Sequence, residues 1–148
     1  MLPLKDSSLF RQQAYVAGHW VDADDKTTVV VTNPANGTPL GTVPMCGSPE
    51  TERAIAAADK AQKTWRDVPA KERAATLRRL NDLMLANADD LALIMTSEQG
   101  KPLAEARGEI GYAASFIEWF ADEGRRAYGD TIPAPQGDRR ILAIKQPI

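Results

Sequence analysis

One long apolar stretch, from Pro102 to about Tyr128, most constrains the fold of this chain. Proline suits the first turn of a helix, and the apolar residues that follow recur at helical spacing, which predicts one continuous helix of roughly 39 Å. A helix that is apolar over so much of its surface has to be covered on two sides. A chain of 148 residues leaves few elements for that cover. The predicted helix carries two neighbouring stripes, one of Leu103, Ala106, Ile110, Ala113, Ile117 and Phe120 and one of Tyr112, Phe116 and Trp119.

The first third of the chain is predicted to be extended. Residues 15–21 and 27–31 are rich in β-branched and aromatic types, and the polar stretch between them suits a turn. These two segments are therefore expected to pair as a hairpin. Asn36-Gly37 is a strong turn signal, and residues 40–43 follow it as a third short strand.

Three more helices are predicted between these strands and the long helix. Ser48 is a natural N-cap for the first, with Pro49 behind it, and this helix runs to Trp65. Pro69 opens the second helix. Asn87 is expected to cap the third, and Gly100 to end it. Strands followed by helices place the chain in the α/β class.

The last segment, Arg140 to Gln146, is predicted to be a strand that is apolar on both faces from Ile141 to Ile144. Residues 129–137 are expected to be a loop, so no second strand of comparable length should lie nearby. Unpaired backbone groups on an apolar strand are a template for another chain. Because the chain ends at Ile148, we expect it to be incomplete and this strand to pair between subunits.

Charge and cysteine content exclude several classes of function. The net charge of −2 gives no reason to expect nucleic acid or an anionic membrane as a partner. The single cysteine, Cys46, cannot form an intramolecular disulfide, which suits a reducing cytoplasm. The N-terminus lacks the pattern of a signal peptide, and no apolar run approaches the length of a membrane span.

The residues give little sign of catalysis by themselves. A catalytic thiol needs a base or an electropositive pocket, so Cys46 is expected to be inert. His19 is isolated, so a structural role is favoured over a metal site. Gly108 and Gly111 lie inside the long helical pattern and do not follow a strand, which excludes a dinucleotide-binding loop. From these patterns alone, the function of the chain stays open.

Several short segments, in order along almost the whole chain, resemble the N-terminal region of the aldehyde dehydrogenase superfamily. Ala54 to Trp65 resembles its alanine-rich first helix, and Lys71 to Leu80 its second helix. Three turns resemble family signatures as well: Asn33-Pro34-Ala35-Asn36-Gly37, Glu98-Gln99-Gly100-Lys101-Pro102 and Gly129-Asp130-Thr131-Ile132-Pro133.

The resemblance implies the N-terminal portion of the aldehyde dehydrogenase fold, with a β-hairpin, a helical layer, an oligomerisation strand and an incomplete Rossmann-like domain. Residues 1–47 would form the extended hairpin segment, residues 48–128 the helices and residues 138–148 the strand of the oligomerisation arm. Within the superfamily, residues 6–14, 112–121 and 144–148 are most similar to bacterial succinate-semialdehyde dehydrogenases of GABA breakdown. Glutarate-semialdehyde dehydrogenases look much the same over this region.

The activity implied for the complete enzyme is oxidation of succinate semialdehyde to succinate with NAD(P)+. The family's nucleophilic cysteine, glutamate base and cofactor-binding glycine turn lie beyond this sequence. The chain is therefore expected to hold no catalytic or cofactor-binding residue, to be inactive alone and to form part of a homo-oligomer, a dimer or tetramer. The alternatives are a fragment of a glutarate-semialdehyde dehydrogenase and a non-catalytic module that exchanges strands with a partner.

Three sets of residues are candidates for sites in the complete enzyme. The resemblance implies that Tyr112, Phe116 and Trp119 border the aldehyde entrance, although plain core packing is an equal alternative. It also implies that Glu98 holds a monovalent cation with backbone carbonyls near Val31 and Thr32, against the alternative of a solvated helix-end charge. The expected subunit interface consists of Arg140, Ile141, Leu142, Ala143, Ile144, Lys145 and Gln146.

Overall fold

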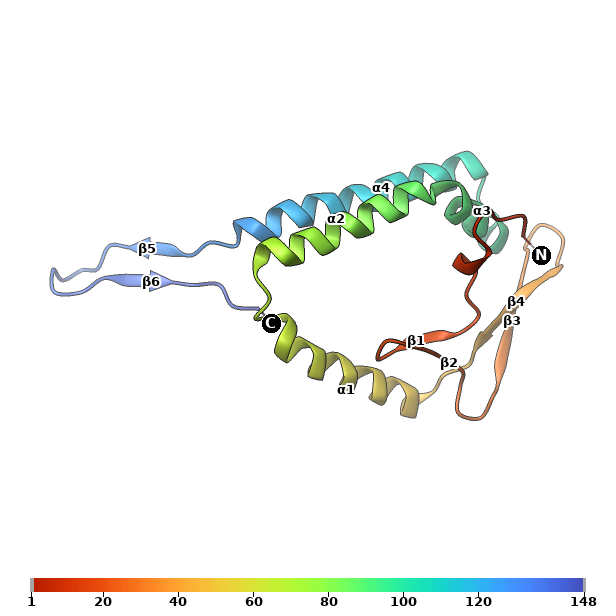
Figure 1. The fold of residues 1–148 in the computed structure, drawn as a ribbon, viewed down its shortest axis with the longest axis horizontal. Helices are drawn as coiled ribbons and strands as arrows, with labels where there is room; N and C mark the ends of the chain where they lie inside the picture. The colour runs from red at the N-terminus through yellow and green to blue at the C-terminus, as the bar shows by residue number, and fades with distance from the viewer. Residues whose placement is uncertain (1, 148) are drawn as a thin grey trace.

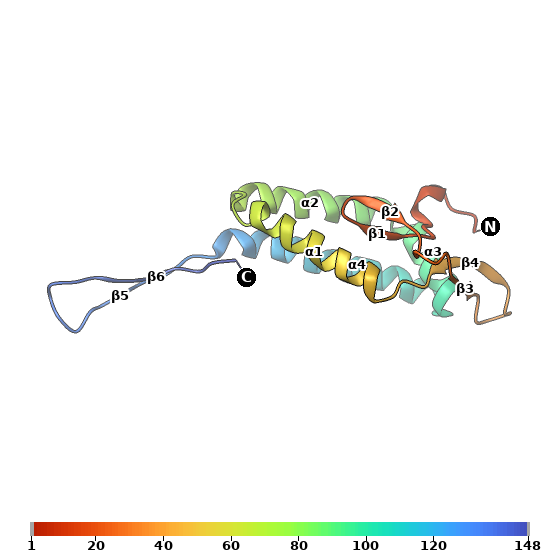
Figure 2. The ribbon, with the colours of Figure 1, turned by 90° about the horizontal axis from the view of Figure 1, so that it is seen from below.

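The computed structural model describes residues 2–147 of the chain, so Met1 and Ile148, the outer ends of two predicted segments, lie outside the described residues. Two long helices, α2 (Ala70–Ala86) and α4 (Leu103–Glu123), run side by side along the upper side of the molecule in Figure 1. Two hairpins, β1–β2 and β3–β4, lie near one end of this pair, and a third, β5–β6, projects from the other (Figures 1 and 2). The structure is mixed α/β, as predicted, but its strands form separate two-stranded sheets rather than one closed sheet.

The first two hairpins differ from the predicted pairing. β1 (Ala14–Val16) pairs with β2 (His19–Val21), so the predicted strand 15–21 folds back on itself. Its turn places Ala17 at φ 53° and Gly18 at φ 87°, a left-handed conformation that alanine rarely adopts and that the sequence therefore did not signal. The predicted pairing of 15–21 with 27–31 is wrong.

The third and fourth strands pair with each other across the Asn36-Gly37 turn. β3 (Thr28–Thr32) is antiparallel to β4 (Pro39–Pro44), with a shift of register between Val31 and Thr32. Gly37 has φ 72°, and its N–H donates to the Asn33 carbonyl oxygen at 2.7 Å. The predicted turn and the two flanking strands are thus confirmed.

The first helix, α1 (Ser48–Trp65), begins with Gly47 at the N-cap, one residue before the predicted cap. The carboxylate of Glu50 is buried there. It accepts from the Gly47 N–H at 2.9 Å and from the Asp24 N–H at 2.8 Å, so it joins the start of the helix to the loop before β3. These hydrogen bonds lower the pKa of Glu50, those from Asp24 and from the helix start being the main causes.

The predicted boundaries of the next two helices are confirmed. α2 (Ala70–Ala86) begins after Pro69, and α3 (Ala88–Gln99) ends at Gly100, whose φ of 80° suits glycine. Asn87 lies at the N-cap of α3, but its amide donates back to the Leu83 carbonyl oxygen at 2.8 Å instead of capping the new helix.

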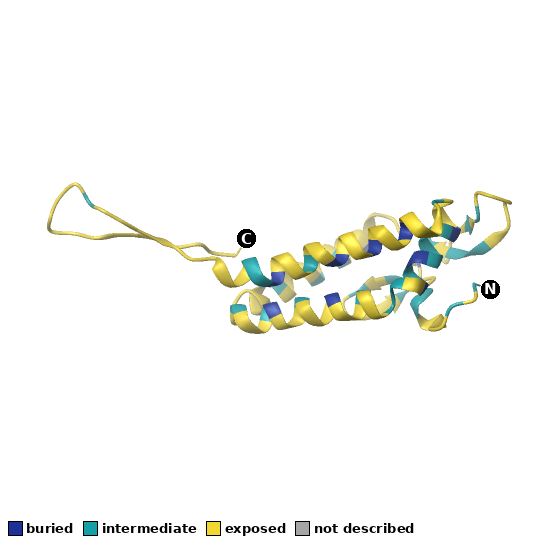
Figure 3. Cartoon of the chain, turned by 90° about the horizontal axis from the view of Figure 1, so that it is seen from above, coloured by how far each residue is buried: buried dark blue, intermediate teal, exposed yellow. Residues whose placement is uncertain are grey.

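The longest helix, α4 (Leu103–Glu123), is shorter than predicted and continues as a single 3-10 turn, η2 (Gly124–Arg126). It packs against α2 and α3 through one narrow stripe of mainly small side chains (Figure 3). The first predicted stripe is buried only at Ala106 and Ile110, and the second is exposed throughout, so residues 2–147 cover α4 on one side only. Small residues pack here because they let the helix axes approach closely. The buried stripe is Ala106, Ile110, Ala114 and Ala121.

A small core forms where α3 meets α4. Ala92, Ala106 and Ile110 are buried together, with Leu91 and Met95 packed against them. The N-terminal segment, which includes the 3-10 turn η1 (Ser7–Leu9), is tied to the same helix. The buried Asp90 carboxylate accepts from the backbone N–H groups of Lys5 at 3.0 Å and of Asp6 at 2.8 Å, which fixes this segment over α3.

The last two strands form an arm that extends away from the helices (Figure 2). β5 (Asp130–Ile132) pairs antiparallel with β6 (Ile141–Ala143), with Thr131 opposite Leu142. The prediction that no second strand lies nearby is wrong, because residues 130–132 of the predicted loop form β5 and the chain turns back over residues 135–138. The predicted strand 140–146 is also shorter than expected. Within residues 2–147, no helix is both long enough and apolar enough to span a membrane.

Candidate functional site

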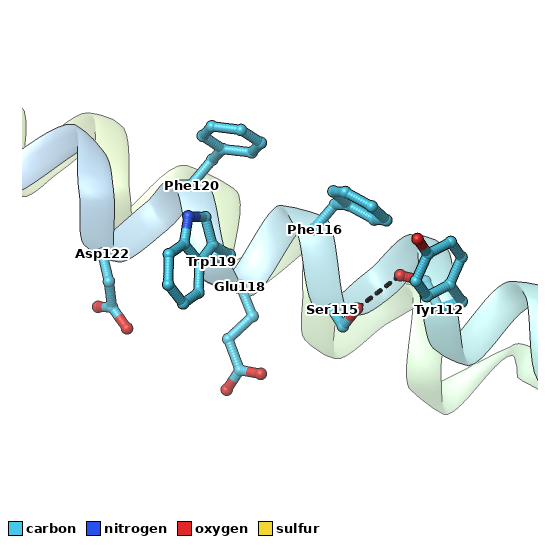
Figure 4. A pocket seen from close by; sticks show the side chains of 7 residues that line it. All are labelled: Tyr112, Ser115, Phe116, Glu118, Trp119, Phe120 and Asp122. Atoms are coloured by element: carbon cyan, nitrogen blue, oxygen red, sulfur yellow. Dashed lines mark hydrogen bonds between the residues drawn. The ribbon is translucent and has the colours of Figure 1, made fainter.

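An open aromatic groove of about 550 Å³ runs along the uncovered face of α4 (Figure 4). We call it the α4 groove. All three residues predicted at the substrate entrance line it: Tyr112 is 66% exposed, Phe116 46% and Trp119 62%. Within residues 2–147 these side chains are not packed into a core; whether they border the entrance of the complete enzyme stays a prediction. Its other lining residues are Ser115, Glu118, Phe120 and Asp122.

Two aromatic rings in the groove hold each other in place. The rings of Tyr112 and Phe116 meet nearly edge to face, with centroids 4.8 Å apart and planes at 80°. Such pairs stabilise aromatic contacts beyond the area that they bury. A smaller hollow lined by the same two rings continues toward Met95 on α3. The groove is thus a continuous apolar surface that begins where α4 leaves α3.

The wall behind the groove is fixed by two polar links between α2 and α4. Asn81 donates its amide N–H to the backbone carbonyl oxygen of Ala114 at 2.9 Å, and both residues are buried. Near the other end, the Arg78 guanidinium forms an ion pair with the Asp122 carboxylate. These links set the rotation of α4 about its axis and so decide which of its side chains face outward.

The polar residues of the groove offer little chemistry by themselves. Ser115 donates its hydroxyl to the Tyr112 carbonyl oxygen at 2.7 Å, so this hydroxyl is engaged within the helix. Asp122 is paired with Arg78, which leaves Glu118 as an exposed carboxylate in the lining. Neither Cys46 nor His19 lines the groove. An apolar, aromatic surface with few polar groups is suited to guiding a small molecule and not to transforming it.

The other two candidate residues for chemistry lie elsewhere. Cys46 is a free, exposed cysteine between β4 and α1, and His19 is exposed in β2. Among residues 2–147, no group of three or more histidine, cysteine or acidic side chains is arranged to hold a metal ion. Gly108 and Gly111 lie inside α4, so they form no loop of the kind that cradles a dinucleotide phosphate.

Glu98 lies exposed in the last turn of α3. The end of this helix is close to the turn that follows β3: a Cβ atom at Gly100 would lie 2.9 Å from Cγ of Pro34. The end of α3 therefore lies near the turn after β3. A cation shared by Glu98 with the carbonyls of Val31 and Thr32 stays a prediction.

The predicted interface residues lie on the β5–β6 arm and on the segment that follows it. Leu142 is 71% and Ile144 74% exposed, which makes them the most exposed large apolar side chains of the described chain. In the hairpin, β6 has β5 along one edge only. The arm therefore presents apolar side chains and the free outer edges of β5 and β6 to solvent.

Four residues of the groove were not predicted from the sequence. Phe120 was assigned to the packed stripe, and Ser115, Glu118 and Asp122 received no role. A sequence signal existed for Phe120, because it follows Phe116 by four residues and so shares its face of the helix. No such signal existed for Asp122, whose partner Arg78 is far away in the sequence.

Comparison with known proteins places these features in a family. Residues 20–148 match the model of the aldehyde dehydrogenase family. The chain is 64% identical over 147 residues to a glutarate-semialdehyde dehydrogenase of Pseudomonas putida, with 99% of this chain and 31% of that protein aligned. It is 60% identical over 147 residues to an NADP(+)-dependent succinate-semialdehyde dehydrogenase of Escherichia coli, with 99% of this chain and 30% of that protein aligned.

Solved structures agree with the sequence matches. A crystal structure of an aldehyde dehydrogenase from Brucella melitensis biovar abortus matches this chain with a TM-score of 0.95 at 60% identity. The match covers 96% of this chain and 29% of the crystallised one. The chain thus spans about 30% of the length of the curated relatives that it matches.

Proposed function

The chain belongs to the aldehyde dehydrogenase family, and on that premise we propose that it is the N-terminal third of an enzyme that oxidises a short aldehyde bearing a carboxylate at its far end. The identity of 60% to 64% with two semialdehyde dehydrogenases, over 99% of this chain, carries this proposal. The reaction converts the aldehyde, water and NAD(P)+ into the carboxylate, NAD(P)H and protons. Succinate semialdehyde is the substrate that we favour, with glutarate semialdehyde as the alternative.

The proposed role of this chain is to shape the approach to the catalytic centre. The α4 groove would form one wall of the aldehyde entrance, with the ring pair of Tyr112 and Phe116 as part of that wall. Aromatic walls favour the methylene chain of the substrate, while their edges tolerate its polar ends. The nucleophile, the base and the cofactor-binding loop are assigned to the part of the relatives that this chain does not cover.

A nicotinamide dinucleotide is the cofactor that we assign to the complete enzyme. The name of the similar enzyme from Escherichia coli specifies NADP(+). The cofactor accepts the hydride in the reaction. We assign no cofactor contact to the residues described above. Because Cys46 is free and unpaired, we also infer a reducing, cytoplasmic location.

We extend the proposal to the two remaining predicted sites. The β5–β6 arm would lie in a contact between subunits of a homo-oligomer, where its free edge and apolar side chains become buried. Glu98 would hold a monovalent cation together with carbonyl oxygens of the turn after β3. Potassium should then raise the thermal stability of the complete enzyme, and Glu98→Gln should abolish this effect. Glu105→Gln, a matched change at an exposed position of α4, should preserve it.

A chimeric enzyme tests the proposal. In it, this chain replaces the matching N-terminal part of the succinate-semialdehyde dehydrogenase of Escherichia coli. The chimera should reduce NADP+ with succinate semialdehyde or glutarate semialdehyde, and its kcat/KM for butanal, which lacks the carboxylate, should be lower. A folded chimera that prefers butanal would contradict the assigned substrate class.

A further inference from the structure

A second hollow, of about 400 Å³, lies where the end of α1, the start of α2 and the segment after β6 meet. We call it the basic pocket. Four of its lining side chains are cationic and none is acidic: Arg66, Arg73, Arg125 and Lys145. The α4 groove shares no residue with it. The function proposed above assigns no role to this pocket.

Most of the positive charge in the basic pocket is not neutralised within the described chain. Among residues 2–147, neither Arg125 nor Lys145 forms an ion pair, and Arg66 has only Asp67 at 3.9 Å, the outer limit of such a contact. Arg73 donates to the carbonyl oxygens of Val68 and Arg66, which fixes its guanidinium at the wall. Four cations around a hollow, with a single weak acidic partner among residues 2–147, create a local potential that attracts anions.

The backbone adds to this potential. α2 begins at Ala70, which also lines the pocket, and Pro69 provides no side chain that could cap its first turn. The free N–H groups and the dipole of a helix start both favour a negative charge. The carbonyl oxygens at the end of α1 could weaken this positive potential, but they are engaged in hydrogen bonds. They accept from the N–H groups of Arg66 and Val68 and from the side chain of Arg73.

The pocket also contains one flat apolar surface. Trp65, the last residue of α1, lines it and is 43% exposed. Arginine forks match the oxygen geometry of phosphate, and an indole ring can stack on a planar group attached to that phosphate. We propose that the basic pocket binds the phosphate group of a small molecule, either inorganic phosphate or a phosphate monoester such as a nucleotide.

Calorimetric titration of the 148-residue chain with inorganic phosphate, at constant ionic strength, tests this site. Saturable binding is expected, and Arg125→Gln should weaken it on the order of tenfold, the effect of losing one charged hydrogen bond. Arg79→Gln removes the same charge from an exposed position of α2 outside the pocket and should leave the affinity unchanged. Lys145→Gln provides a second pocket variant if Arg125→Gln alters the circular dichroism of the chain.

A parallel titration with AMP identifies the source of the phosphate. If the ligand is a nucleotide, AMP should bind about tenfold more tightly than phosphate, and Trp65→Ala should remove this gain. Equal affinities would assign the pocket to the phosphate group alone. The proposal is overturned if acetate binds as tightly as phosphate, if no saturable binding occurs, or if Arg125→Gln and Arg79→Gln have the same effect.

Discussion

The side-chain amide of Asn81 on α2 donates to the backbone carbonyl oxygen of Ala114 on α4 at 2.9 Å, in the buried contact between the two helices. Ala114 is part of the small-residue stripe on which α4 packs. The outward face of α4, with the aromatic groove, lies opposite this stripe. The hydrogen bond therefore determines how the candidate entrance is oriented, although neither residue reaches it.

Replacing Asn81 with alanine should destabilise the chain by about 1–2 kcal/mol, because a buried hydrogen bond is lost and a cavity remains. Asn87→Ala is a matched control: its amide bonds to the Leu83 carbonyl oxygen at 2.8 Å, but in an exposed position. The midpoints of urea denaturation measure both effects. Equal shifts for the two variants would show that burial does not strengthen the Asn81 link.

Gly100 should be irreplaceable at the corner between α3 and α4. Its φ of 80° disfavours other residues, and an added Cβ would lie 2.9 Å from Cγ of Pro34. Gly37 has a similar φ of 72° with open space around it. Gly37→Ala should therefore cost about 1 kcal/mol from the backbone alone. Gly100→Ala should cost distinctly more in the same denaturation assay, and an equal cost would mean that Pro34 yields freely.

Tyr112→Ala in the chimeric enzyme should change the preference among aldehydes of different chain length, because it removes one aromatic side chain from the lining of the α4 groove. The expected change is a several-fold shift in the ratio of kcat/KM for succinate and glutarate semialdehyde, the scale of one methylene contact. Tyr15→Ala, at a similarly exposed tyrosine on β1, should leave this ratio unchanged. An unchanged ratio for Tyr112→Ala would remove this side chain from the entrance.

Leu142→Pro should reduce the oligomeric state of the complete enzyme. Proline at this position removes a backbone donor from β6 and an apolar side chain from the exposed face of the arm. Gln136→Pro, in the turn of the same hairpin, should keep the oligomer. Size-exclusion chromatography distinguishes the two. Leu142→Asp keeps the donor but removes the apolar contact, so an intact oligomer in both Leu142 variants would contradict an interface here.

The helices could be predicted from the sequence, and the pairing of the strands could not. Helix starts and stops are encoded locally, by Pro69 and Gly100 for example, so neighbouring residues suffice to find them. Hairpins depend on the turn, and the first hairpin turns at Ala17-Gly18, where alanine takes an unusual positive φ. β5 escaped prediction because its three residues are too few to establish a period.

The candidate groove was predictable only in part for a similar reason. Helical spacing brought Tyr112, Phe116 and Trp119 to one face, but it did not tell which face of α4 is buried. That choice depends on contacts with α2 that are distant in sequence, above all Asn81 with Ala114 and Arg78 with Asp122. Helix periodicity contains no information about such partners.

NADPH formation from succinate semialdehyde, measured in three samples, tests whether this chain is the N-terminal third of a semialdehyde dehydrogenase. The samples are this chain, the remaining two-thirds of the Escherichia coli enzyme expressed separately, and the two mixed and refolded together. Neither part alone should turn over the substrate, and the mixture should be active, because this chain contributes the scaffold and entrance and the other part the catalytic groups. Turnover by this chain alone that is abolished by Cys46→Ser would contradict this assignment.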